Sequence, residues 1–220
     1  LFEMIEGANS GKVKAMYIMG DNPIFNLPDS AFIKASLEKL DFLVVQDIFM
    51  TETAEIADVV LPALGWSEKD GTYTNLERRI QRLRKAVNRQ GMEDWKILSE
   101  TGKKMGLKMS YNSSSDIMDE ISKVSHLHAG LAYEDLEKGS DIWPYKGEPL
   151  RHKLGAGDWP LTEAWVPSEK DALYLSIEKH MFLSGSMSRN SSALNSIYEE
   201  PYAKMSQNAA KKHGMADGDL

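Results

Sequence analysis

The stretches AMYIMGDNP (15–23), DFLVVQDIFMTETAEIADVVLP (41–62) and EKDGTYTNLERR (68–79) decide the fold of this 220-residue chain. The first two each contain an apolar run that is too short for a helix, and each run ends in polar, turn-forming residues. Strands of an open α/β sheet have this pattern, because they present backbone N–H groups and polar side chains to a nucleotide at their carboxyl ends. The segment from Ala15 to Arg82 therefore predicts a ligand-binding edge.

Within this segment the apolar runs predict parallel strands at residues 15–19, 42–45 and 59–61. Ser30 is expected to cap the helix between the first two strands, and Thr51 a short helix after the second. The second strand is continuously apolar, which is typical of a parallel strand covered on both faces. Successive strand–helix–strand steps indicate right-handed crossovers, so the predicted fold class is α/β.

The rest of the chain predicts helices separated by irregular segments. Asp94 is expected to cap one helix, Ser114 or Ser115 the next, and Ser206 the last. Between residues 125 and 170, Gly, Pro, Trp and Tyr recur with neither a helical nor a strand period. That stretch indicates a connecting region or a boundary between two domains, and strand character returns after it at Leu173 to Ile177.

The composition is that of an ordinary soluble globular protein, with 42% hydrophobic and 27% charged residues. No apolar run approaches the ~18 residues of a membrane span, and no signal peptide opens the chain, which predicts a cytoplasmic protein. The net charge of −7 argues against a nucleic-acid partner. One basic cluster is either a solvated, salt-bridged face or a phosphate contact; it comprises Arg78, Arg79, Arg82, Arg84 and Lys85.

The residue types that carry most catalytic and metal chemistry are missing or scattered. The chain has no cysteine, which excludes disulfides and Cys-held zinc or iron–sulfur sites within it. Its five histidines form no HExxH motif, and surface positions explain them better than metal binding. No Ser/His/Asp arrangement, pair of catalytic carboxylates or P-loop is identifiable. We therefore predict no catalytic residue and no metal ligand in this chain.

Two loops at the predicted strand ends could bind a nucleotide. The glycine turn at Gly20 permits close backbone approach to a phosphate or sugar, but it lacks GxGxxG spacing and could equally be a plain turn. Gln46 and Asp47 follow the second strand, where an acid can accept hydrogen bonds from a ribose or a purine edge. The alternative is that Asp47 only caps the next turn.

A third candidate loop, SGSMS at residues 184–188, surrounds a glycine with small hydroxyl residues and is followed by Arg189. Exposed hydroxyls and backbone amides there could bind a phosphate or the edge of a pterin ring, and the arginine would supply positive charge. The alternative is a flexible loop without a ligand.

The stretches MYIMGDNP, DFLVVQDIFMTETAEIADVVLPA and EKDGTYTNLERRIQR together resemble the corresponding parts of molybdopterin oxidoreductases of the bis(molybdopterin guanine dinucleotide) class. Within that class the likeness is to the formate dehydrogenase α subunit. The later stretch LSGSMSRNSSALNSIYEEPYAKMSQNAAKKHGMADGDL is similar to the opening of the family's C-terminal dinucleotide-binding domain.

The resemblance implies a domain organisation and a set of cofactor contacts. Residues 1–125 would form part of a Rossmann-like dinucleotide-binding domain, residues 126–170 a connecting region, and residues 171–220 the truncated start of a β-barrel-like C-terminal domain. The implied cofactor-binding residues are Gly20, Asp21 and Asn22 near the phosphates, Gln46 and Asp47 at the guanosine with Thr51, Thr53 and Asp58 nearby, Gly71, Thr72 and Asn75 on the pterin side, and Ser184, Gly185, Ser186, Met187 and Ser188 in a loop that closes over the cofactor.

The resemblance also implies a reaction in which a molybdenum- or tungsten-bound molybdopterin guanine dinucleotide takes an electron pair from formate or another small substrate. A 4Fe-4S cluster would carry the electrons to iron–sulfur partner subunits. The family's cluster cysteines, its metal-ligating Cys or selenocysteine and its catalytic His–Arg region would belong to sequence before this chain, in the remainder of its own subunit. We therefore expect the chain alone to be inactive and to bind cofactor weakly.

Two alternatives remain open from the sequence. The chain could belong to another molybdopterin-family oxidoreductase, including the large subunit of an NADH–quinone reductase. It could also be a noncatalytic nucleotide-binding or subunit-interface module.

Overall fold

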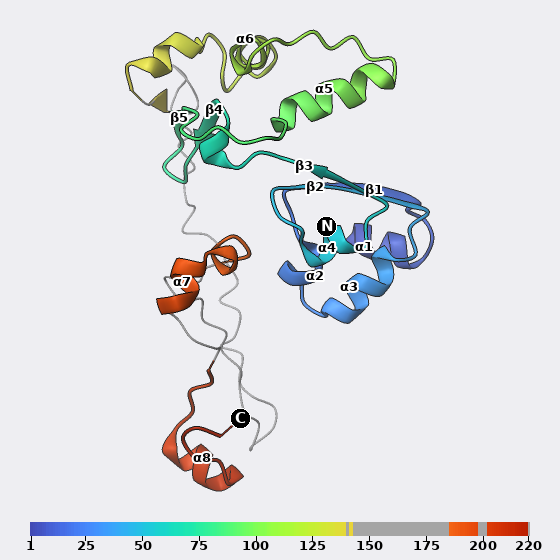
Figure 1. Ribbon diagram of the computed structural model, residues 1–220, viewed down its shortest axis with the longest axis vertical. Helices are drawn as coiled ribbons and strands as arrows, with labels where there is room; N and C mark the ends of the chain where they lie inside the picture. The colour runs from blue at the N-terminus through green and yellow to red at the C-terminus, as the bar shows by residue number, and fades with distance from the viewer. Residues whose placement is uncertain (140, 143–184, 198–201, 220) are drawn as a thin grey trace, which may run out of the picture. The chain divides into compact units, whose positions relative to one another are not determined.

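The computed structural model describes residues 1–139, 141–142, 185–197 and 202–219 (Figure 1). The chain divides into two compact units, residues 1–166 and 167–220. The expected strand at 173–177 and the loop residue Ser184 lie outside the described residues. The barrel-like start and the domain ranges expected from the sequence therefore stay predictions.

A parallel sheet forms the centre of the first unit. Its strands are β1 (Ala15–Met19), β2 (Phe42–Asp47) and β3 (Val59–Pro62), in the order β1-β2-β3. The predicted strands, their parallel pairing and the α/β class are confirmed. β2 runs beyond its predicted end at Val45, so that Gln46 lies inside the sheet and pairs with Met19 and Leu61.

The helices before and between these strands pack on one face of the sheet (Figure 1). They are α1 (Phe2–Asn9), α2 (Pro23–Asn26), α3 (Ser30–Leu37) and α4 (Glu52–Glu55). The core between sheet and helices consists of Ile5, Met16, Ile18, Ile24, Ile33, Leu37, Leu43, Val45 and Ala54. Burial of these aliphatic side chains is the main stabilising contribution in this half of the chain.

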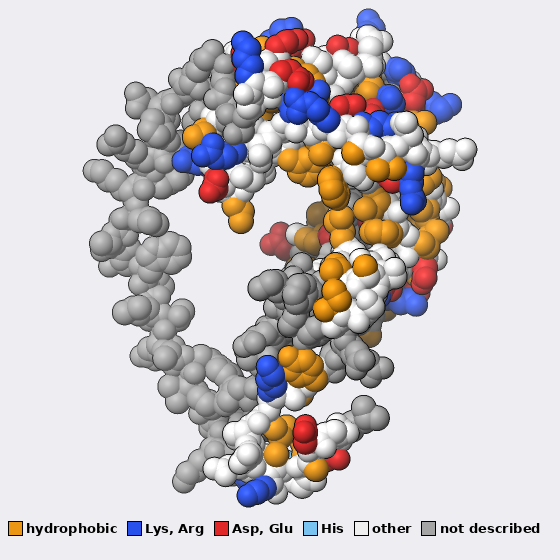
Figure 2. Space-filling model, turned by 60° about the vertical axis from the view of Figure 1, so that its left-hand side comes forward, with side chains coloured by type: hydrophobic (Ala, Val, Ile, Leu, Met, Phe, Trp, Pro, Cys, Tyr) orange, Lys and Arg blue, Asp and Glu red, His pale blue; other side chains and the backbone are white. Residues whose placement is uncertain are grey.

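The opposite face of the sheet is covered only in part by the described residues. It carries Tyr17, Phe42 and Val59, which are 40%, 47% and 37% exposed. Exposed hydrophobic side chains of this kind gather in patches on the surface (Figure 2). The expectation that β2 is covered on both faces is therefore wrong for the described residues, because its apolar run includes outward positions such as Phe42.

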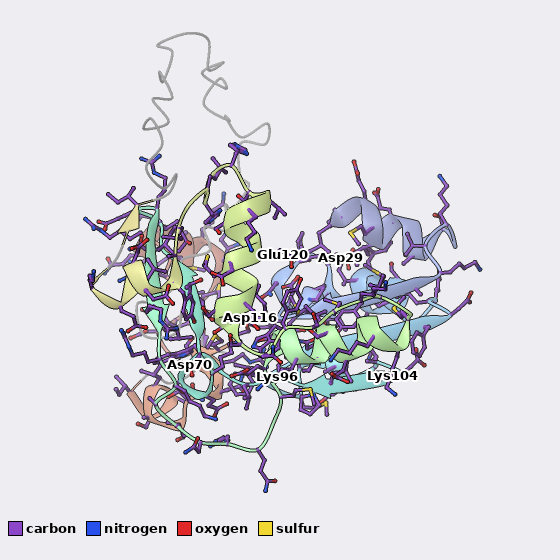
Figure 3. All side chains as sticks on the ribbon, turned by 90° about the horizontal axis from the view of Figure 1, so that it is seen from above. Asp29, Asp70, Lys96, Lys104, Asp116 and Glu120 are labelled. Atoms are coloured by element: carbon purple, nitrogen blue, oxygen red, sulfur yellow. The ribbon has the colours of Figure 1, made fainter. Side chains whose placement is uncertain are left out.

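Helix α5 (Asp94–Lys104) approaches that second face. Figures 1 and 3 agree that α5, which carries the labelled Lys96 and Lys104, lies over the side of the sheet opposite α1–α4. A hydrogen bond of 2.7 Å from Gln46 Nε2 to Asp94 Oδ1 joins the helix to β2. The helix thus covers the carboxyl end of the sheet and buries Gln46 completely.

The caps of the early helices agree with the sequence in one case and differ by a residue in the other. Thr51 caps α4 as predicted, since its side chain accepts a hydrogen bond from Ala54 N at 3.2 Å. Asp29, not Ser30, caps α3 and accepts from Phe32 N at 3.1 Å. The free N–H groups of the first turn are therefore capped from one position earlier than the predicted serine.

The caps of the later helices were mispredicted in two cases and predicted correctly in the third. Ser113 caps α6 (Ser114–Val124), one residue before the expected serines. Asp94 is the first residue of α5 and caps nothing, because its carboxylate is bonded to Gln46 and Lys69 instead. In the second unit Ser206 does cap α8 (Gln207–His213).

A second, antiparallel sheet lies downstream in the first unit. It consists of β4 (Gly71–Thr74), β5 (Arg79–Leu83) and β6 (Asp141–Ile142). The 3-10 helix η1 (Trp66–Glu68) precedes β4, and η2 (Tyr133–Glu137) precedes β6. Its core comprises Ile80, Met118, Leu131, Tyr133 and Leu136. The helix η2, in a stretch that shows no periodicity in sequence, thus packs against β5 and α6, and β6 pairs with β5. None of the described helices combines the length and apolar character needed to cross a membrane.

We expect Leu43→Ala to lower the free energy of unfolding by about 2–5 kcal/mol, the usual cost of truncating a buried leucine. The adjacent Phe42→Ala should cost less, since Phe42 is 47% exposed and Leu43 only 2%. Urea denaturation followed by circular dichroism measures both losses. Equal losses would contradict the assignment of the two side chains to a covered and an open face of β2.

Candidate functional site

The carboxyl ends of β1 and β2 bring two of the predicted binding loops to the same edge of the sheet. Gly20 follows β1 with a φ of +63°, a conformation that favours glycine, and its N–H donates to Gln46 O at 2.9 Å. Asp47 is the last residue of β2, so its side chain leaves the sheet beside this turn. Parallel pairing alone produces this convergence, because neighbouring strands then end at one edge.

Asn22 and Thr53 lock the two loops together below that edge. Asn22 Oδ1 accepts hydrogen bonds from Thr53 Oγ1 at 2.7 Å and from Thr53 N at 3.3 Å, and Asn22 Nδ2 donates to Glu52 Oε2 at 2.7 Å. Asn22 is 3% exposed and Thr53 is fully buried. With their polar groups paired inside the protein, both residues shape the edge and Thr51 caps the helix that carries Thr53.

Asp21 and Asp47 are half-buried carboxylates at the same edge. Asp21 Oδ1 accepts from Asn22 N at 2.9 Å and from Asn26 Nδ2 at 2.8 Å, and Asp47 Oδ1 accepts from Phe49 N at 3.0 Å. Within the described residues neither carboxylate forms an ion pair, and their Oδ2 atoms accept no hydrogen bond. Asp47 therefore does cap the next turn, yet it keeps an oxygen that can accept from a ligand.

Gln46 is fully buried and is fully engaged. Tyr17 Oη donates to its Oε1, its Nε2 donates to Asp94 Oδ1 at 2.7 Å, and Lys69 Nζ completes the chain by donating to Asp94 Oδ2. Burial raises the pKa of Tyr17, and the nearby carboxylate of Asp94 raises it further. Gln46 lies inside β2 near its carboxyl end, not after the strand as expected, and its amide points into this network.

The third predicted segment forms a hairpin from β4 and β5. Asn75 Oδ1 accepts from Arg79 N at 2.9 Å and shapes the turn, in which Arg78 has a φ of +65°. Arg82 Nη1 donates to Gly71 O at 3.2 Å and fixes the start of β4. Thr72 is half-buried, and its hydroxyl forms no hydrogen bond with the residues that the structure describes.

The basic cluster on this hairpin is a salt-bridged face, the first of the two alternatives. Arg82 Nε and Arg84 Nη2 bind the two carboxylate oxygens of Glu137 at 2.8 and 2.5 Å, and Arg79 pairs with Glu77 at 3.1 Å. Hydrogen bonds from Arg82 and Arg84 lower the pKa of Glu137. These arginines therefore tie β5 to η2.

Gly71 differs from the other glycine of the candidate site in the first unit. Its φ is not in the left-handed region, and no atom lies within 4 Å of the point where a Cβ would be. Neither backbone strain nor packing among the described residues requires glycine there, whereas Gly20 needs its positive φ. A glycine in such a strand fits a place where another group approaches the backbone closely.

Asp58 and the serine loop, two parts of the predicted cofactor-binding set, do not belong to the carboxyl edge of the sheet or to the hairpin. Asp58 precedes β3 at the amino edge, where its Oδ2 accepts from Leu43 N at 2.7 Å. Because Val59 pairs with Val44, Asp58 lies level with Leu43 and is separated from Asp47 by roughly 13 Å along β2 at ~3.3 Å per residue. The expectation that Asp58 lies near the guanosine residues is therefore wrong.

The described part of the serine loop belongs to the second unit. There Ser188 Oγ accepts from Gly185 N at 3.1 Å and donates to Gly185 O at 2.9 Å, which closes a compact turn. Asn190 Nδ2 donates to Ser186 O at 2.9 Å, and Met187 is 53% exposed. The turn leaves Ser186 and Met187 at the surface, and its predicted role in binding stays a prediction.

Comparison with known proteins supplies the context for this edge. Residues 1–104, which contain all the loops of the first unit described above, match the model of the molybdopterin oxidoreductase family. Residues 1–104 belong to the molybdopterin oxidoreductase family. The family match ends with α5, while similarity to individual relatives continues beyond it.

Those relatives include subunits of formate dehydrogenases. The chain is 40% identical to the F420-dependent formate dehydrogenase subunit alpha of Methanocaldococcus jannaschii over 99% of its own length and 35% of the relative's. It is 37% identical to the F420-dependent formate dehydrogenase 2 subunit alpha of Methanococcus maripaludis, over 94% of this chain and 34% of that one. A probable oxidoreductase of Bacillus subtilis is 38% identical over 99% of this chain and 24% of its own.

A solved structure agrees with the architecture. Acetylene hydratase from Pelobacter acetylenicus superposes with a TM-score of 0.53 at 22% identity, over 64% of this chain and 20% of that chain. At that identity the likeness supports the α/β fold alone. The predicted resemblance to the molybdopterin oxidoreductase family is confirmed, and the chain spans about a third of the length of its formate dehydrogenase relatives.

Sequence reasoning missed Tyr17, Lys69 and Asp94 in this molybdopterin oxidoreductase domain. Asp94 precedes a helix in sequence and so resembled a cap, and Lys69 is one of many lysines. Their positions in the sequence are the signal that could have identified two of them. Lys69 lies two residues before Gly71, and Tyr17 is a residue with a polar hydroxyl inside an apolar strand. Their long-range partners are visible only in the fold.

Asn22→Ala should lower the free energy of unfolding by about 1–3 kcal/mol, because it leaves the buried Thr53 hydroxyl and N–H without an acceptor. Asn26→Ala is the matched control and should cost less than about 0.5 kcal/mol, since Asn26 is exposed. Adding Thr53→Val to Asn22→Ala should cost less than the sum of the single losses. Additive losses in a urea-based double-mutant cycle would contradict the lock.

Proposed function

We propose that this chain forms one wall of a molybdopterin guanine dinucleotide site in the catalytic subunit of a molybdenum- or tungsten-dependent formate dehydrogenase. The observation that carries the proposal is the pair of half-buried carboxylates, Asp21 and Asp47, at the carboxyl edge of the parallel sheet. Dinucleotides bind at this edge in open α/β sheets. The family match and the formate dehydrogenase relatives support the choice of cofactor and substrate.

The residues present fit the dinucleotide arm of such a cofactor. The free oxygens of Asp21 and Asp47 can accept hydrogen bonds from ribose hydroxyls or from the N–H groups of a guanine, and Gly20 permits close backbone approach. At the pterin end, Gly71 has open space beside its backbone. Thr72 has a hydroxyl that forms no hydrogen bond with the described residues. Asn22, Gln46, Thr51, Thr53 and Asn75 hold these groups in place and contact the ligand less directly.

The bound metal–pterin would supply the two-electron oxidation of formate to carbon dioxide. The residues of this chain bind and orient the dinucleotide arm. Because the chain contains no cysteine, a thiolate metal ligand and the ligands of a 4Fe-4S cluster would come from the rest of the subunit. The chain alone is then inactive and retains cofactor weakly, since it supplies only part of the site.

The proposal extends to the assembly and its location. The relatives are named as subunits alpha, which supports the presence of other subunits. The further proposal is that these subunits transfer electrons through iron–sulfur clusters and that the complex is cytoplasmic. The proposal keeps the loop of Ser184, Gly185, Ser186, Met187 and Ser188 as a cofactor contact in the complete subunit, as the family resemblance implies. Nothing in Asp21, Asp47 or Gly71 selects formate, so the same wall would serve another molybdopterin oxidoreductase. The similarity to a probable oxidoreductase supports this second candidate function.

Asp47→Asn in the complete subunit should lower the retention of guanine nucleotide and metal about tenfold or more, as expected from losing a charged hydrogen-bond acceptor worth ~1.5–3 kcal/mol. The amide oxygen introduced by this substitution could still accept from Phe49 N, so the fold should persist. Asp41→Asn is the matched control, because Asp41 lies at the opposite end of β2 and pairs with the exposed Lys14, at 3.5 Å.

The measurement is the guanine nucleotide, pterin and metal released on denaturation, together with formate-dependent dye reduction. A wild-type subunit that releases no guanine nucleotide would overturn the cofactor. Equal retention by the Asp47 and Asp41 variants would overturn the assigned edge. Cofactor without formate-dependent reduction would favour another oxidoreductase of the family.

A further inference from the structure

The three parts of the proposed cofactor wall are joined by one chain of polar side chains that passes through Asp94 and Lys69. We infer that Asp94 and Lys69 are positioning residues, which hold the start of β4 at a set distance from the carboxyl edge of the sheet. This inference rests on the proposed function, because the distance matters only if a ligand bridges the edge and β4. Neither residue belongs to the predicted contact set.

Gln46 is the fixed end of the chain. It is fully buried, its backbone oxygen accepts from Gly20 N at 2.9 Å, and its Oε1 accepts from Tyr17 Oη. These bonds tie Gln46 to β1 and to the Gly20 turn. Its Nε2 then donates to Asp94 Oδ1 at 2.7 Å, so any movement of Asp94 acts on an amide that cannot turn away without losing buried hydrogen bonds.

Asp94 is the bridge, since its two carboxylate oxygens face different partners. Oδ1 binds Gln46, and Oδ2 accepts from Lys69 Nζ. The side chains of Lys69 and Asp94 are only 21% and 29% exposed, which limits screening of the pair by solvent. Asp94 also lies in the first turn of α5, where the helix dipole favours a negative charge.

Lys69 connects the bridge to the hairpin. It lies two residues before Gly71, so the backbone distance between them is at most about 7 Å. The base of the hairpin is itself anchored beside Lys69, because Ser67 O accepts from Ala86 N at 2.8 Å and Val87 N at 2.9 Å. A shift of Lys69 relative to α5 would therefore carry Gly71 and Thr72 with it.

A second ion pair on the same helix offers a control. Lys103 Nζ binds Glu100 Oε1 at 2.8 Å, and both side chains are about half exposed at 44% and 56%. This pair joins two positions of α5 to each other, so its removal should leave the proposed wall unchanged. Comparison of the two pairs separates positioning of the wall from a general effect of charge on α5.

The experiment uses the complete subunit and measures the rate at which guanine nucleotide and metal are lost, together with amide hydrogen exchange in segments 15–22 and 69–76. Asp94→Asn and Lys69→Met should each speed cofactor loss about tenfold, the effect of one charge-assisted hydrogen bond, and should speed exchange in segment 69–76. The double variant should be no worse than either single one. Lys69→Arg should restore most of the wild-type rate, and Glu100→Gln and Lys103→Met should stay within about twofold.

The outcomes separate this inference from the proposed function. Unchanged cofactor loss and exchange in the Asp94 and Lys69 variants of a cofactor-bearing subunit would overturn the inference and leave the proposed function standing. A wild-type subunit without guanine nucleotide would overturn both. If Asp94→Asn does not fold, the substitutions at Lys69 still decide, because they leave the hydrogen bond between Gln46 and Asp94 in place. Equal effects of Lys69→Met and Lys103→Met would overturn the positioning role.

Discussion

The buried amide of Gln46 is the interaction on which the carboxyl edge of the sheet depends. It lies in the central strand, and its backbone and side chain together hold the Gly20 turn, Tyr17 and Asp94. An amide in this position must find partners for both its donor and its acceptor, since leaving either unpaired costs about 1–3 kcal/mol. The surroundings of Gln46 satisfy both, and in doing so they connect β1, β2 and α5.

In this arrangement some polar residues hold the structure together, and others keep atoms that are available to a ligand. Asn22 and Thr53 are paired with each other and close the edge from below, while Asn75 shapes the hairpin turn. Asp21 and Asp47 keep carboxylate oxygens that bind nothing among the described residues. The buried amides and hydroxyls are thus structural supports, and the proposed ligand contacts are the exposed parts of the two acids.

Much of the fold could be predicted from the sequence because its signals are local. The strands are short apolar runs with polar ends, and β1 begins and ends at the predicted residues. The cap of α3 was misplaced by one residue, since Asp29 and Ser30 are both good caps and only the backbone conformation decides between them. The segments of η2 and β6 gave no signal, because their contacts with β5 are distant in sequence and follow no period.

The site was predictable in its location and less so in its details. The position of the carboxyl edge follows from the direction of the strands, which the sequence reveals. The hydrogen-bond partner of a side chain cannot be read from the sequence. Asp94 illustrates this limit, because a helix-capping residue and a bridge to Gln46 look the same in sequence. Asp58 shows the opposite error. It is close to Asp47 in sequence, but it lies beside Leu43, near the other end of β2.

The most direct test of the central claim is a structure of the complete subunit with its cofactor bound. The account predicts that an oxygen of Asp47 lies within about 2.7–3.2 Å of a donor on the guanosine part of the cofactor, with the backbone of Gly71 facing the pterin part. A dinucleotide bound at the amino edge beside Asp58, or one that makes no contact with residues 20–75, would contradict it.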